Sequence, residues 1–167
     1  MNEIKFKGQP VSISGTFPKK GSQAPSFTLV AQDLRACDLS SFEGKNKILN
    51  IFISLDTPVC SKSMHAFNSK ASALSDVVIL NISMDLPFAA SRFCKAEHLE
   101  NVITLSAFRS SFPEDYGVKI AKGPLEGLCA RAVLVLGKDN KILHSQLVSE
   151  ITEEPDYESA LTSLKSS

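Results

Sequence analysis

The chain has 167 residues, of which 43% are hydrophobic and 22% charged, the profile of one ordinary globular domain rather than of a disordered or collagen-like chain. Basic and acidic residues total 18 each, and the longest basic run is Lys19-Lys20, which excludes the charge pattern of a nucleic-acid or anionic-membrane binder. No apolar secretory stretch or membrane span is evident, so we expect one domain over residues 1–167, located in the cytoplasm.

The first part of the chain predicts strands. Short alternating pieces at 3–7, 11–14 and 27–30, separated by turn-forming residues, indicate a hairpin and edge strands. The run from Ile48 to Ile53 is almost continuously apolar, which is typical of a central strand buried on both faces.

Helices and strands then alternate. We predict helices at 58–74, 87–99 and 156–164, and strands at 77–82, 102–103, 132–136 and 142–148, the last two joined by a hairpin turn at 137–140. This order predicts an α/β (α+β) fold in which a central mixed β-sheet is flanked by helices and preceded by an N-terminal β-hairpin. The thioredoxin-like architecture fits it.

Cys60 follows the central strand at the start of a helix. Thr57 suits the N-cap and Pro58 the first helical position, which makes Cys60 the third residue. The free N–H groups and the dipole of a first turn favour an anion, and the thiolate is the reactive form of cysteine. Helical spacing puts Cys60 on an inward-facing stripe with Met64, Phe67, Ala71 and Leu74. The pattern predicts a shielded, activated thiol, with a packed core cysteine as the alternative.

Cys94 belongs to the helix that begins near Pro87. The apolar residues Phe88, Ala89, Phe93, Ala96 and Leu99 gather on one side, and Cys94 projects with Ser91, Glu97 and His98 on the other. We therefore expect Cys94 to be reachable by solvent, as a candidate for disulfide exchange or as an incidental surface cysteine.

Arg131 directly precedes the apolar strand at 132–136, so its guanidinium needs a partner at the edge of the core. It could hold a thiolate or a peroxide oxygen, although without other evidence a structural ion pair is the better interpretation. Cys37 and Cys129 are interpreted as small packing residues.

Other chemistries have weaker support. Cys94 and His98 are four residues apart and could ligate zinc, but no Cys-x-x-Cys or His-x-x-x-His pair completes the site. His65 points away from Cys60 around its helix, which disfavours a cysteine hydrolase, and there is no Gly-rich phosphate loop. The lack of Cys-x-x-Cys also disfavours a thioredoxin-type electron carrier. We expect no metal and no cofactor.

Several long segments, in order along nearly the whole chain, resemble the bacterial thiol peroxidases, the atypical two-cysteine branch of the peroxiredoxins. Residues 54–60 (SLDTPVC) resemble the peroxidatic-cysteine motif, and residues 85–94 (DLPFAASRFC) the resolving-cysteine helix. Segments 101–106, 116–118, 127–132 and 150–157 resemble further family signatures.

The resemblance assigns roles to individual residues. Cys60 matches the peroxidatic cysteine, Thr57 the threonine that hydrogen-bonds thiolate and peroxide, Arg131 the catalytic arginine and Cys94 the resolving cysteine. It implies a thioredoxin-like fold, a homodimer, and reduction by thioredoxin. The implied activity is reduction of hydrogen peroxide and organic hydroperoxides, through a Cys60 sulfenic acid and an intramolecular Cys60–Cys94 disulfide, in antioxidant defence.

Ile53 departs from the family pattern Pro-x-x-x-Thr-x-x-Cys, which places a shielding proline at this position. Isoleucine is apolar and can still exclude water, but it changes the shape of the pocket and so bears on rate and substrate choice. The alternative function is accordingly a peroxide-sensing relay protein with the same disulfide and a slow peroxide step.

Overall fold

A computed structural model describes residues 4–71, 74–99 and 102–165. The strands are β1 (Ile4–Phe6), β2 (Gln9–Val11), β3 (Ile13–Ser14), β4 (Leu29–Ala31), β5 (Ala36–Cys37), β6 (Asn46–Ile51), β7 (Val77–Ser83), β8 (Ile103–Ser106), β9 (Lys119–Ile120), β10 (Ala132–Leu136) and β11 (Ile142–Leu147). The helices are the short 3-10 helix η1 (Leu39–Phe42) and the α-helices α1 (Pro58–Ala71), α2 (Pro87–Ala96), α3 (Phe112–Asp115) and α4 (Tyr157–Lys165).

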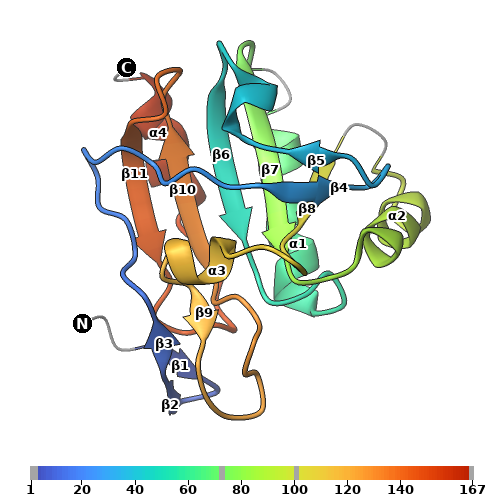
Figure 1. Cartoon of the computed structure of the whole chain (residues 1–167), viewed down its shortest axis with the longest axis vertical. Coiled ribbons are helices and arrows are strands. Elements are labelled where there is room, and N and C mark those ends of the chain that lie inside the picture. The colour runs from blue at the N-terminus through green and yellow to red at the C-terminus, as the bar shows by residue number, and fades with distance from the viewer. Residues whose placement is uncertain (1–3, 72–73, 100–101, 166–167) are drawn as a thin grey trace.

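A mixed sheet of seven strands, in the order β11-β10-β6-β7-β8-β4-β5, forms the centre of the fold (Figure 1). Strands β6, β7 and β8 run parallel, and β10 pairs antiparallel with both β6 and β11. The register places Ala132, Ile51, Ile82 and Leu105 in one row across four strands. The prediction of a mixed sheet flanked by helices is confirmed.

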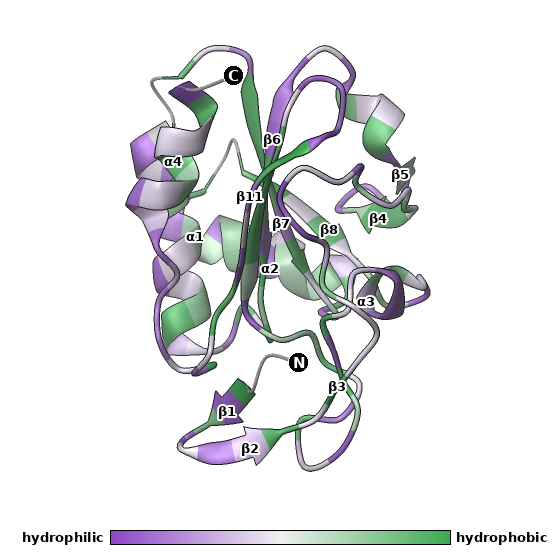
Figure 2. Cartoon of the chain, turned by 90° about the vertical axis from the view of Figure 1, so that its left-hand side faces the viewer, coloured by the Kyte–Doolittle hydropathy of each residue, from purple (hydrophilic) through white to green (hydrophobic). Residues whose placement is uncertain are grey.

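The central strands are buried on both faces, as the apolar run predicted. Ile48 and Val133 face α1 and α4 in one cluster, whereas Leu49 and Leu134 pack with α3 in another. Figure 2 shows α1 and α4 on one side of the sheet and α3 on the other. Because β6 and β7 end together, the loops after them meet at one edge, where α1 begins.

The N-terminal hairpin is confirmed: β1 and β2 pair antiparallel, and of the predicted range 3–7 only residue 3 lies outside the described residues. The prediction of an edge strand at 27–30 was wrong. Strand β4 pairs with β8 on one side and with β5 on the other, because the short β5 supplies the actual edge. Strand β8 is also longer than the predicted 102–103.

Two helices end earlier than predicted. Helix α1 ends at Ala71, with residues 72–73 outside the described part of the chain, and Leu74 is 41% exposed rather than on the buried stripe. Helix α2 ends at Ala96 because His98 adopts a left-handed backbone, with φ of +57°. The N–H of Leu99 then bonds the Cys94 carbonyl at 2.8 Å, closing a Schellman cap. Among the described residues, no helix is long and apolar enough to cross a membrane.

Candidate active site

Cys60 is the third residue of α1, as predicted, and its side chain is fully buried. The Thr57 carbonyl accepts the first helical hydrogen bond, from the Ser61 N–H at 3.1 Å, which places Thr57 at the N-cap. The Arg131 Nη2 atom donates to Cys60 Sγ at 2.8 Å. Residues 71 positions apart are thus brought together, and the partner of Arg131 is a sulfur atom rather than the carboxylate of a structural ion pair.

Arg131 is 1% exposed and is held by the backbone. Its Nε donates to the Ile151 carbonyl at 2.8 Å, and the Ile151 N–H donates to the Lys5 carbonyl, also at 2.8 Å. The N-terminal hairpin therefore supports the segment that orients the guanidinium. The Nη1 atom is buried and has no hydrogen-bond partner in the described part of the chain. It leaves one charged donor for a group that enters the site.

The Thr57 hydroxyl donates to the Ser54 carbonyl at 2.8 Å. Because a hydroxyl has one proton and two lone pairs, Thr57 in this arrangement can accept a hydrogen bond from an incoming peroxide but has no proton left for the thiolate. This differs from the double role that the resemblance implied.

Ile53 is 5% exposed and packs in the same buried cluster as Cys60, Phe52 and Leu55. The position is apolar and closed to water, so isoleucine provides shielding where the family pattern has proline.

The prediction that Cys94 is exposed was wrong. Cys94 is 6% exposed and shares the buried face of α2 with Pro87, Ala90 and Phe93, whereas Phe88 is 68% exposed. The helix carries apolar residues around most of its circumference, and its packing against β8 selects a different face from the one chosen by Phe88.

A neutral side chain holds Cys94. Gln32 Nε2 donates to Cys94 Sγ at 3.6 Å and to Thr104 Oγ1 at 2.7 Å. Burial raises the pKa of the Cys94 thiol above its ordinary value of 9.0, and the Gln32 hydrogen bond opposes this in part. No local sequence pattern indicates Gln32, because it lies 62 positions from Cys94.

The zinc hypothesis required Cys94 and His98 on one helical face. His98 instead lies beyond the end of α2 with a left-handed backbone and an exposed side chain, while Cys94 points into the core. The described residues contain no group of three or more His, Cys, Asp or Glu side chains that could hold a metal ion.

The two thiols belong to one buried cluster but are held at separate places. Arg131 directly precedes β10, whereas Thr104, which anchors Gln32, lies on β8. Strands β6 and β7 lie between these two strands in the sheet. Cys60 and Cys94 are both free thiols, and a disulfide between them needs their two Cα atoms within about 7 Å.

The remaining cysteines lie away from this chemistry. Cys129 is fully buried, and burial raises its pKa to about 12. Burial also raises the pKa of the half-buried Cys37, and both residues pack in or against the largest core cluster. The interpretation of both as packing residues is confirmed.

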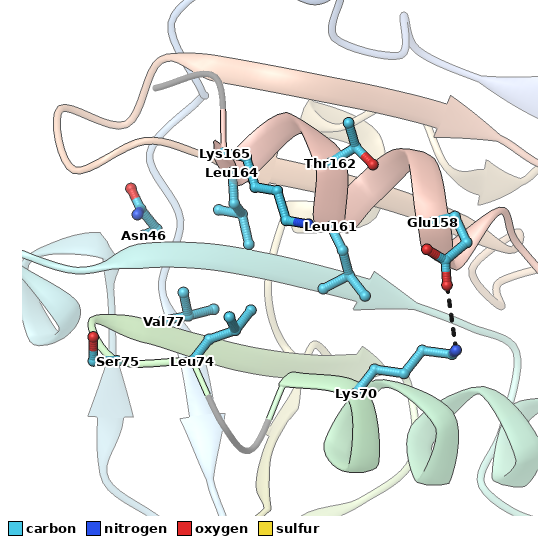
Figure 3. A pocket seen from close by; sticks show the side chains of 10 residues that line it. All are labelled: Asn46, Lys70, Leu74, Ser75, Val77, Glu158, Leu161, Thr162, Leu164 and Lys165. Atoms are coloured by element: carbon cyan, nitrogen blue, oxygen red, sulfur yellow. Dashed lines mark hydrogen bonds and ion pairs between the residues drawn. The ribbon is translucent and has the colours of Figure 1, made fainter.

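A cavity of about 440 Å³ opens at the opposite end of β6 from Cys60 (Figure 3). It lies between α1, α4 and the starts of β6 and β7, and the Lys70–Glu158 pair crosses it at 3.4 Å. None of the described residues that line it is a cysteine or a histidine. The candidate active site is therefore a closed, buried centre and not this open pocket.

Comparison with known proteins places this geometry in a family. The sequence signature described as Redoxin matches residues 19–161. The chain is 49% identical to the thiol peroxidases of Mycobacterium bovis and Mycobacterium tuberculosis, over 98% of this chain and 99% of each relative. The chain belongs to the Redoxin family. Within it, the protein is a peroxiredoxin of the thiol peroxidase type, as the sequence resemblance predicted.

Solved structures agree with the fold. A peroxiredoxin-like protein from Aquifex aeolicus superposes with a TM-score of 0.93 at 37% identity, covering 99% of this chain and 97% of that one. A thiol peroxidase from Chromobacterium violaceum gives a TM-score of 0.92 with the same coverage, and at 22% identity it bears on the fold alone. The predicted thioredoxin-like fold and thiol-dependent peroxidase activity are confirmed, and the sensor and zinc alternatives are not favoured.

Proposed function

We propose that this thiol peroxidase works through Cys60 as the peroxidatic cysteine, Cys94 as the resolving cysteine, and Arg131 and Thr57 as the groups that bind the peroxide. The observation that carries the proposal is the 2.8 Å contact between Arg131 Nη2 and Cys60 Sγ inside a water-excluded cluster. A buried guanidinium next to a first-turn cysteine stabilises the thiolate, the form that attacks.

In the first step the Cys60 thiolate attacks the terminal oxygen of the hydroperoxide. The S–O bond forms as the O–O bond breaks, sulfur gives up two electrons, and the departing oxygen takes a proton to leave as alcohol or water. Arg131 Nη1, the buried donor without a partner, is available to the oxygen on which charge develops. Thr57 is available to accept from the peroxide O–H.

In the second step Cys94 attacks the sulfenic sulfur of Cys60, forming the disulfide and releasing water. Because Gln32 and the last turn of α2 hold Cys94 in place, we infer that local unwinding frees it for this attack. Helix α2 is suited to it, because its C-terminal cap places the non-glycine residue His98 in the left-handed region, at a cost of about 1–3 kcal/mol. A dithiol reductant then reopens the disulfide by exchange.

Finer expectations belong to the same proposal. Thioredoxin is the expected reductant, and the expected assembly is a homodimer of single-domain chains spanning residues 1–167 in the cytoplasm. Leu86 and Phe88 are both exposed at the start of α2 and offer a neighbouring pair of apolar side chains for a protein contact there.

The test compares wild type with Cys94→Ser. We expect the variant to consume one equivalent of peroxide at the wild-type rate and then stop, because its sulfenic acid has no internal partner. Stopped-flow mixing measures the single turnover, a thioredoxin-coupled assay measures steady-state turnover, and non-reducing peptide mapping of the wild type should show a Cys60–Cys94 linkage. Cys37→Ser is the matched control and should turn over normally. Full thioredoxin-supported turnover in Cys94→Ser would remove Cys94 from the mechanism.

A further inference from the structure

One carboxylate lies between the two cysteine-bearing segments. Asp85 follows β7 and comes two residues before α2. Its side chain accepts hydrogen bonds from Ser54 Oγ and from the Leu55 N–H, each at 2.8 Å. Both donors belong to residues 52–57, here called the catalytic loop, which connects β6 to α1 and carries Thr57. Asp85 is thus bound to the segment that delivers Cys60.

Asp85 is itself fixed to the sheet. Ser83 Oγ at the end of β7 donates to the Asp85 carboxylate at 2.8 Å and accepts from the Asp85 N–H at 3.2 Å. Ser106 Oγ at the end of β8 donates to the Asp85 carbonyl at 2.5 Å. Both serines are 4% exposed. The carboxylate therefore projects from a rigid, buried base.

The contacts continue from Asp85 to Thr57. The Ser54 carbonyl accepts from Thr57 Oγ1 at 2.8 Å and from the Thr57 N–H at 3.2 Å, and Ser54 Oγ also accepts from the Asp56 N–H at 3.2 Å. Ser54 is thus held at its hydroxyl by Asp85 and holds Thr57 at its carbonyl. Hydrogen bonds to a charged acceptor are about twice as strong as neutral ones, so Asp85 is the strongest anchor in this chain of contacts.

We propose that Asp85 is a positioning residue for the peroxide step. By fixing the catalytic loop to β7, it sets where Thr57 stands relative to the Cys60 thiolate, so that both meet the peroxide together. Asp85 acts through Ser54 and Leu55, whereas the contact of Cys60 with Arg131 comes from a different strand. The proposal rests on the proposed function of Cys60.

Two reagents distinguish the positioning of the peroxide from the reactivity of the thiolate itself. Reduction of a peroxide needs the thiolate and correctly placed hydrogen-bonding groups, whereas alkylation by iodoacetamide needs only an accessible thiolate. We expect Asp85→Ala to lower the rate constant of Cys60 with hydrogen peroxide by about 10- to 100-fold, the cost of a small misplacement. Its alkylation rate should be unchanged or higher, because a looser loop exposes the buried sulfur.

Two matched variants complete the experiment. Asp85→Asn keeps an acceptor oxygen and should restore a peroxide rate between those of Asp85→Ala and wild type. Asp38→Ala removes a carboxylate that likewise accepts from serine groups, Ser40 Oγ and the Ser41 N–H, at the start of η1 and away from Cys60. It should react as wild type does. If Asp85→Ala does not fold, Ser54→Ala removes one donor and should show the same selective loss at smaller size.

The outcomes are distinguishable. A wild-type protein whose Cys60 does not reduce peroxide would end the proposed function itself. With an active wild type, the positioning role is overturned if Asp85→Ala reacts at the wild-type rate, or if peroxide reduction and alkylation fall by the same factor. A selective loss of the peroxide reaction, partly rescued in Asp85→Asn, establishes it.

Discussion

Cys60 and Cys94 are both buried in the same cluster, yet their surroundings differ in charge. Cys60 lies in the first turn of α1, where the helix dipole favours an anion, and a guanidinium donates to its sulfur at 2.8 Å. Cys94 lies in the last turn of α2, where the dipole disfavours an anion, and a neutral amide donates at 3.6 Å. Burial disfavours the reactive thiolate of a cysteine. A positive charge opposes this effect at Cys60 and not at Cys94.

The supports of the two thiols differ in the same way. Arg131 is tied to the backbone of the segment after β11, and that segment is tied to β1. Cys94 depends on a helix whose last turn ends in a strained cap and on one half-buried glutamine. In the proposed mechanism, Cys60 is therefore held in place for its attack on the peroxide, and Cys94 is released before it attacks Cys60.

Removing the charge at Cys60 should have the largest effect. Arg131→Met keeps much of the buried volume but takes away both the donor to sulfur and the free Nη1 donor, so we expect the peroxide rate constant to fall by about 100-fold or more. Stopped-flow oxidation measures the loss. Arg35→Met, which removes an exposed arginine paired with Asp33, should leave the rate unchanged. A folded Arg131→Met enzyme at the wild-type rate would contradict the electrostatic account.

The surroundings of Cys60 could be predicted from the sequence because their signals are local. The helix start at Thr57, Pro58 and Cys60 depends on neighbouring residues, and Arg131 stands out as a charge beside an apolar strand. Only the partner of Arg131 had to come from the fold, since the residues alone favoured a structural ion pair.

The surroundings of Cys94 were predicted less well from the sequence. In α2 the apolar residues occupy most of the helix surface, so periodicity did not decide between the face with Phe88 and the face with Cys94. Gln32 and Asp85 were missed as functional candidates because each acts on residues from another strand or loop. Short polar side chains in such places have no spacing pattern that distinguishes them from ordinary loop residues.

The contrast in charge should appear in the pH dependence of Cys94. Because burial raises its pKa above the ordinary 9.0, the thiolate is scarce at neutral pH and the alkylation midpoint should lie above pH 9. Below that midpoint the rate should rise roughly tenfold per pH unit. For the same reason the unfolded thiol ionises at lower pH than the folded one, so this group stabilises the protein below pH 9 and its contribution is lost as the pH rises through the folded pKa.

The measurement is peptide-resolved alkylation of Cys94 in a Cys60→Ser background, with the same peptide in urea as the reference. A native midpoint at or below that of the unfolded chain would mean that Cys94 is activated in place and does not wait for release.

Gln32 offers a finer and smaller test of the same contrast. The hydrogen bond from the Gln32 amide to Cys94 forms only while α2 is folded. It therefore stabilises the starting state of the resolving step and not the unwound state that reacts. This hydrogen bond contributes a net stabilisation of about 0.5–1 kcal/mol. Gln32→Leu should therefore speed disulfide formation by about 2- to 5-fold while leaving the peroxide step unchanged. Thr104→Val, which removes the anchor of Gln32, should act in the same direction with a smaller effect.

The matched control is Gln23→Leu, since Gln23 donates its amide to the Asp139 carbonyl far from both thiols. Rapid acid quench followed by non-reducing peptide mapping gives the rate of the Cys60–Cys94 linkage in each variant. Slower resolution in Gln32→Leu would reverse the interpretation: the amide would then be stabilising the attacking thiolate itself, and Cys94 would react from its folded position. Faster resolution would mean that the contacts holding Cys94 limit the rate of disulfide formation. The peroxide step of Cys60, by contrast, depends on the contacts that hold it.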